Sequence, residues 1–167
     1  MADPLWVMID DYLKTMVTAE IGTGNAGLNG DALQVNYVTT GYTERVEDWK
    51  PWPKPTILIV GVRKESEAGP HGDGGVHYDQ DYAYAMLGIV ENLREAADRD
   101  AKILAERIED MLRDVDRITL GDLTDGTGHV YFVRLAETEV RLFRKENVNA
   151  ERYYGVAGVS FLVESER

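Results

Sequence analysis

The sequence predicts an α+β protein in which one mixed or antiparallel β-sheet of about four to six strands packs against an N-terminal helix and one long central helix. Two observations lead to this class. Residues 78–115 pass directly from a strand-like alternation into a helical repeat, and further apolar segments of strand length lie on both sides. A length of 167 residues suits a single domain, 1–167, and no linker-like segment divides it.

The central unit is predicted to be a strand over 78–91 followed by a helix over 93–115. Asn92 with Glu95 three residues later resembles a capping box, which marks a helix start. Apolar residues then recur at spacings of three and four, so at about 100° per residue they gather in one stripe that is expected to bury against the sheet. The stripe consists of Ala97, Ala101, Leu104, Ile108, Met111 and Val115.

The N-terminal segment predicts a first amphipathic helix over 4–20. Asp3 suits the cap position and Pro4 the first helical position. The next segment, GTGNAGLNGD over 22–31, has the glycine spacing of a dinucleotide-binding loop. That motif requires a strand before it and a helix after it, whereas here a helix precedes it and a turn follows. We therefore interpret it as a turn that leads to a short strand over 32–38, and we expect no cofactor.

A proline-rich segment over 39–55 contains Trp49 and Trp52 and is predicted to be extended. The two indoles are expected either on the face of the sheet or against a neighbouring chain. The consecutive apolar residues of TILIVGVRK, 56–64, predict a strand that is covered on both sides. A Gly-rich loop over 65–77 is expected to join it to the central unit, and such a loop suits a partner contact or a lid.

Strand patterns resume after the central helix. We expect a short strand over 117–122 and a turn after it. Strand-like patterns over 129–135 and 139–143 predict a strand region 129–143, and the final strand is predicted over 153–163. In that last segment both alternating rows are largely apolar, which indicates burial on both faces or coverage by another subunit.

The formal charge of −12 argues against a protein that reads nucleic acid, because phosphate neutralisation requires clustered Lys and Arg. An acidic surface could also serve a protein past which DNA slides without adhering, but the favoured interpretation is that the charge simply aids solubility. No apolar run reaches the roughly 18 residues of a membrane span, so we expect no membrane partner. There is no cysteine, which excludes disulfides and zinc–thiolate sites.

His71, Asp73 and His77 form the only close group of potential metal ligands. Glycines around them would hold ligands poorly, so a polar hairpin loop is the favoured interpretation. No nucleophile elbow, phosphate loop or helical His pair accompanies them. We therefore expect no catalytic residue, no metal and no enzymatic activity.

Three pieces carry a resemblance to a known family. They are TILIVGVRK, the passage DYAYAMLGIVENLREAADRDAKILAERIEDML, and the closing strand RYYGVAGVSFLV. Together with the order of elements from Leu5 to Val163, this sequence resembles the tail terminator (tail-to-head joining, minor tail U-like) proteins of long-tailed bacteriophages.

The resemblance implies a structural virion protein that forms a ring, usually a homohexamer. Such a ring caps the head-proximal end of the tail tube, contacts the tube protein and a neck or head-completion protein, and lets DNA pass through its hole. Assembly takes place in the host cytoplasm, and the finished protein lies in the virion tail. Candidate contact residues under this view are Ile103, on the charged side of the central helix, Trp49, Trp52, Glu65, Glu67, His71, Asp73 and His77.

Three alternatives stay open from the sequence. The first is a neck, head-completion or other tail protein. The second is a small metal-dependent enzyme that uses residues 71–77. The third is a cytoplasmic binding module that uses the Trp/Pro segment.

Overall fold

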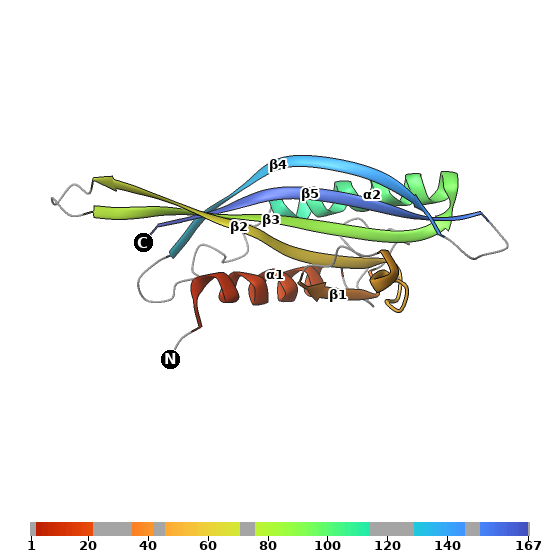
Figure 1. Ribbon diagram of the computed structural model, residues 1–167, viewed down its shortest axis with the longest axis horizontal. Helices are drawn as coiled ribbons and strands as arrows, with labels where there is room; N and C mark the ends of the chain where they lie inside the picture. The colour runs from red at the N-terminus through yellow and green to blue at the C-terminus, as the bar shows by residue number, and fades with distance from the viewer. Residues whose placement is uncertain are drawn as a thin grey trace.

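The structure is a computed structural model that describes residues 3–21, 35–41, 46–70, 76–113, 129–145 and 151–166. It is an α+β fold with one mixed five-stranded sheet in the order β1-β2-β3-β5-β4 (Figure 1). β1 pairs with β2 in parallel, and the other neighbours pair antiparallel. The elements are α1 (Leu5–Ile21), β1 (Tyr37–Thr40), the 3₁₀ turn η1 (Val46–Trp49), β2 (Thr56–Pro70), β3 (Val76–Leu93), α2 (Arg94–Arg113), β4 (His129–Arg144) and β5 (Arg152–Glu166). The predicted fold class is confirmed.

The central strand passes directly into the central helix, as the periodicity predicts. Five of the six stripe residues, from Ala97 to Met111, are fully buried, whereas Val115 lies outside the described residues. The start of the helix differs from the one that the predicted capping box implies. Asn92 still belongs to β3, and its Oδ1 accepts a hydrogen bond from the backbone N–H of Leu93 at 2.8 Å. The helix begins two residues later, at Arg94.

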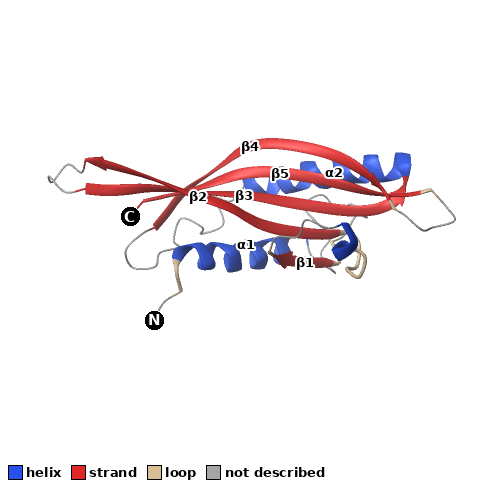
Figure 2. Cartoon of the chain, viewed as in Figure 1, coloured by secondary structure: helices blue, strands red, loops and turns tan. Residues whose placement is uncertain are grey.

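Both helices pack on one face of the sheet. Ile9 and Leu13 of α1 share a buried cluster with Leu104 and Ile108 of α2 and with alternate residues of the long strands. Figure 2 shows the two helices running alongside the strands. On β3 this helix face is made by the even-numbered residues, because side chains alternate across a strand. The odd-numbered residues of β3 and the even-numbered residues of β5 therefore form the opposite face, which we call the open face.

α1 is tied to the sheet by one buried hydroxyl. Tyr84 of β3, only 1% exposed, donates a hydrogen bond to Asp10 Oδ1 at 2.5 Å. Burial, and then the bond to Asp10, raises the pKa of Tyr84 well above its ordinary value. Asp10 is thus a half-buried acceptor on α1.

Several predicted boundaries are wrong. Of the strand expected over 32–38, residues 32–34 lie outside the described residues, and β1 is found at Tyr37–Thr40, where four residues pair with Thr56–Ile59 of β2. The loop expected over 65–77 is much shorter, since β2 continues to Pro70 and pairs with β3 from Val76 onward. Residues 129–144 form one strand that accommodates an irregularity between Leu135 and Glu137. The segments 22–31 and 117–122 lie outside the described residues.

The long β2–β3 hairpin gives the protein an arm. Figure 1 shows β2 and β3 extending together beyond both helices at the end of the sheet opposite the β3–α2 corner. β5 reaches only as far as Asp79, where Glu166 pairs with it, so the arm beyond that point consists of two strands. No helix in the described part of the chain is long and apolar enough to cross a membrane.

Candidate assembly surface

The open face carries a shallow depression of about 300 Å³ over β3, β4 and β5. Its floor consists of half-buried or buried side chains that include Leu87, Val156 and Phe143. Glu137 and Arg141 of β4 are exposed and form part of its charged rim. An apolar floor with a charged rim is the typical anatomy of a protein contact surface.

A strap of residues 46–55 borders the depression. Trp49, the last residue of the 3₁₀ turn, packs with Ile89, Tyr154 and Val156 in a second, smaller cluster on the open face. Its indole meets Tyr154 edge to face, with ring centroids 6.0 Å apart. Such aromatic pairs contribute about 0.5–1.5 kcal/mol beyond their buried area. The strap is therefore anchored on the sheet by a side chain that is only 6% exposed.

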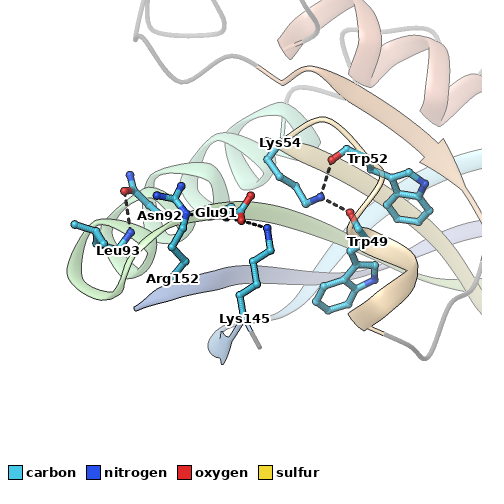
Figure 3. Close-up of polar contacts among 8 residues, drawn as sticks. All are labelled: Trp49, Trp52, Lys54, Glu91, Asn92, Leu93, Lys145 and Arg152. Carbon is cyan, nitrogen blue, oxygen red and sulfur yellow. Dashed lines mark hydrogen bonds and ion pairs between the residues drawn. The ribbon is translucent and has the colours of Figure 1, made fainter. Parts of the chain in front are cut away.

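Lys54 stabilises the strap through hydrogen bonds to its backbone. Lys54 Nζ donates to the carbonyl oxygens of Trp49 and, at 2.6 Å, of Trp52 (Figure 3). The same ammonium lies 5.5 Å from the centroid of the Tyr154 ring. Burial lowers the pKa of Lys54, and the carboxylate of Glu91 partly opposes this. Two carbonyl acceptors and one aromatic ring thus hold the charged head close to the sheet.

Basic side chains surround one carboxylate near the β3–α2 corner. Lys145 Nζ donates to Glu91 Oε1, and Arg152 Nε lies 3.8 Å from the same oxygen (Figure 3). The hydrogen bond to Glu91 raises the pKa of Lys145. Burial raises the pKa of Tyr154, and the neighbouring Lys145 opposes that shift. Leu93, paired with Arg152 across the strands, is 54% exposed and adds an apolar side chain to this basic end.

The arm end of the same face is acidic. Asp81 of β3 lies between Glu65 of β2 and Glu164 of β5, and in the next row Asp79 pairs with Glu166. Like charges directly opposite each other on a sheet repel. Two ion pairs offset part of this repulsion, Arg63 with Glu65 at 3.1 Å and Arg134 with Glu164 at 3.4 Å. The open face is therefore acidic at the arm, apolar in the middle and basic at the corner.

The structure places the sequence-derived contact candidates in different environments. Trp49 is buried within its own chain, and Trp52 is half-buried, with its ring centroid 5.7 Å from that of Tyr37. Ile103, which the sequence places on the charged side of the central helix, is half-buried on α2. Glu65 belongs to the acidic rows.

Two of the remaining candidates, Glu67 and His77, belong to the arm. The backbone of Glu67 pairs with Asp79, and that of His77 with Gly69. His71 and Asp73 lie outside the described residues. Among the residues that the structure does describe, no group of three or more His, Asp or Glu side chains could hold a metal ion.

Several residues of this surface were missed by sequence reasoning. Arg152 and Glu164 lie at opposite ends of a strand that reads as apolar, and Phe143 lies at the end of β4. The one available signal was the alternation of β5, which shows that Arg152, Gly158 and Glu164 share a face. No family model matches the chain, and no curated protein matches it.

Proposed function

We propose that this chain is a structural virion protein, a ring-forming tail terminator that caps the head-proximal end of a phage tail tube and joins it to the head or neck. The three sequence pieces that carry the resemblance form adjoining parts of the fold, namely β2, the β3–α2 unit and β5. Under this proposal the partners are further copies of the chain, the tube protein and a neck or head-completion protein. The chain is not an enzyme and requires no cofactor.

The observation that carries the proposal is the acidic arm. In the described part of the chain this hairpin extends past both helices, so we assign it to a contact with a ring neighbour, with the tube or with the central hole (Figure 1). Its base carries Asp79, Asp81 and Glu164 on one face. Carboxylates that line a hole repel the phosphates of DNA, so DNA slides through without adhering.

The direct experiment is imaging of the purified chain. Multi-angle light scattering gives the mass of the assembled species over a wide concentration range, and negative-stain microscopy shows its shape. We expect closed rings with a central hole and about six copies. A species that stays monomeric and ring-free at all concentrations contradicts the proposal.

A matched variant separates this function from metal chemistry. Replacing His71 and His77 by Ala should leave ring formation nearly intact, and a chelator should have no effect on it. Loss of function with retained folding, together with stoichiometric binding of a divalent metal to the unmodified chain, would instead favour the metal-dependent alternative.

A further inference from the structure

The features of the open face are arranged about one cross-strand row. Leu87 of β3 pairs with Gly158 of β5, which pairs in turn with Glu139 of β4. All three line the depression. This row is the natural reference for the charges that lie on either side of it.

Charges of opposite sign lie at equal distances from that row. On β5, Arg152 lies six residues before Gly158 and Glu164 lies six residues after it, as the register with β3 shows. At about 3.3 Å per residue each charge is roughly 20 Å from the row. On β4 the same relation holds closer in, because Glu137 pairs with Ser160 and Arg141 with Val156, one position of the face on each side.

The two sides of the row also differ in the size of the side chains that stand on them. On one side of the row Trp49 covers Val156 and Ile89, so the strap forms a ridge. On the other side the equivalent positions are Ser160 and Ala85, small side chains that line the depression and are half-buried. The strap therefore stands on one side of the row, small side chains occupy the equivalent positions on the other side, and the depression spans the row between Val156 and Ser160.

We propose that two copies of this chain pack open face to open face about a twofold axis that lies between the two sheets and runs across the strands at the Leu87–Gly158 row. This rotation places Arg152 of each copy over Glu164 of the other, and Arg141 over Glu137. It also sets each strap against the small residues of its partner. A twofold contact requires a self-complementary surface, and packed sheets are about 10 Å apart.

The charges favour a second copy of the chain as the partner, and they favour a twofold axis that runs across the strands. A twofold axis along the strands would place the acidic end over another acidic end, which costs several kcal/mol for juxtaposed like charges. With the axis across the strands, Arg152 meets Glu164 and Arg141 meets Glu137, whereas Glu139 lies on the row of the axis and meets its own copy. The charge pattern of the open face is therefore complementary to the open face of a second copy.

The twofold contact goes beyond the proposed ring. An isologous contact closes on itself, so it cannot alone build a ring of more than two copies. The two proposals therefore concern different contacts, and the charge-reversed variants distinguish them.

The experiment uses two charge-reversed chains in sedimentation velocity. The first carries Glu137→Lys with Glu164→Lys, and the second carries Arg141→Glu with Arg152→Glu. Each should lose self-association by at least tenfold in Kd, because opposite charges become like charges at both contacts. An equimolar mixture should restore the dimer, since every reversed charge then meets its complement.

Controls on the other face of the molecule make the result specific. Lys102→Glu and Glu106→Lys reverse exposed charges on α2, and both should dimerise like the unmodified chain. Circular dichroism should show that all variants fold. A monomeric unmodified chain overturns the proposal, as do reversed variants that self-associate normally or a mixture that stays monomeric. Rings whose mass neither pair of reversals changes would leave the tail terminator standing and overturn the twofold contact.

Discussion

Replacing Gly155 by alanine should destabilise the fold strongly, because α2 lies directly on β5 at this residue. A Cβ at this position would lie 2.4 Å from the carbonyl oxygen of Ala97 and 3.0 Å from the Cβ of Ala101. Both neighbours belong to α2. The closest atom is backbone, so it cannot rotate away as a flexible side chain can.

The magnitude follows from this geometry. Ordinary carbon–oxygen contacts are about 3.3 Å or longer, so α2 must move away by roughly 0.9 Å. Overpacking of this kind costs about 1–3 kcal/mol, and a clash with backbone belongs at the upper end. Replacing glycine also restricts the unfolded chain, which returns about 0.5 kcal/mol. The free energy of unfolding should therefore fall by about 2 kcal/mol.

The same strand offers a matched control on the open face. A Cβ at Gly158 would meet Leu87 Cδ2 at 3.5 Å and Glu139 O at 3.8 Å, which are ordinary contacts. Gly158→Ala should therefore be neutral or stabilising by up to about 1 kcal/mol. Urea unfolding at one fixed protein concentration, followed by circular dichroism, measures both variants. Equal stability of Gly155→Ala and Gly158→Ala would refute the packing of α2 on β5.

Three further predictions concern the core, the strap and the arm. Tyr84→Phe removes the hydrogen bond to Asp10 and should cost about 1–2 kcal/mol in urea unfolding. Because the pKa of Tyr84 in the folded state lies above the unfolded value of 10.0, its contribution is fully present below pH 10.0 and declines at higher pH by at most about 1.4 kcal/mol per pH unit. That alkaline decline should be smaller in Tyr84→Phe, and an unchanged profile would contradict the assignment. Trp49→Ala should cost about 3 kcal/mol in the same assay, because it removes the buried indole of the strap; a change below 1 kcal/mol would show that the strap is not anchored there. Asp81→Asn should stabilise the chain by about 0.5 kcal/mol at low salt and by less at high salt, because it removes like-charge repulsion; destabilisation would show that the carboxylates are favourably compensated.

Local periodicity was sufficient to predict the central unit. Residues of β3 alternate and those of α2 repeat by threes and fours, so the strand, the helix and its buried stripe all follow from the sequence. The same signal failed over 65–70, where ESEAGP reads as a loop. These residues are strand because β3 supplies hydrogen-bond partners as far as Val76. Pairing between strands overrides weak local propensity there.

The candidate surface depends on contacts that sequence spacing does not encode. Glu65, Asp81 and Glu164 come from three separate strands, and only the register of the sheet brings them into one row. In the same way Trp49 meets Phe143 and Tyr154 across long stretches of chain. The acid content was visible in the sequence, whereas its collection at one end of the open face required the structure.

The measurement that tests the central claim most directly is the position of the chain in finished particles. Phage particles from the host that carries this sequence would be purified and labelled with a gold-tagged antibody raised against the chain. The proposed function predicts gold at the junction of head and tail, and only there. Particles that lack the chain, or that carry label along the tube or at the tail tip, would contradict it.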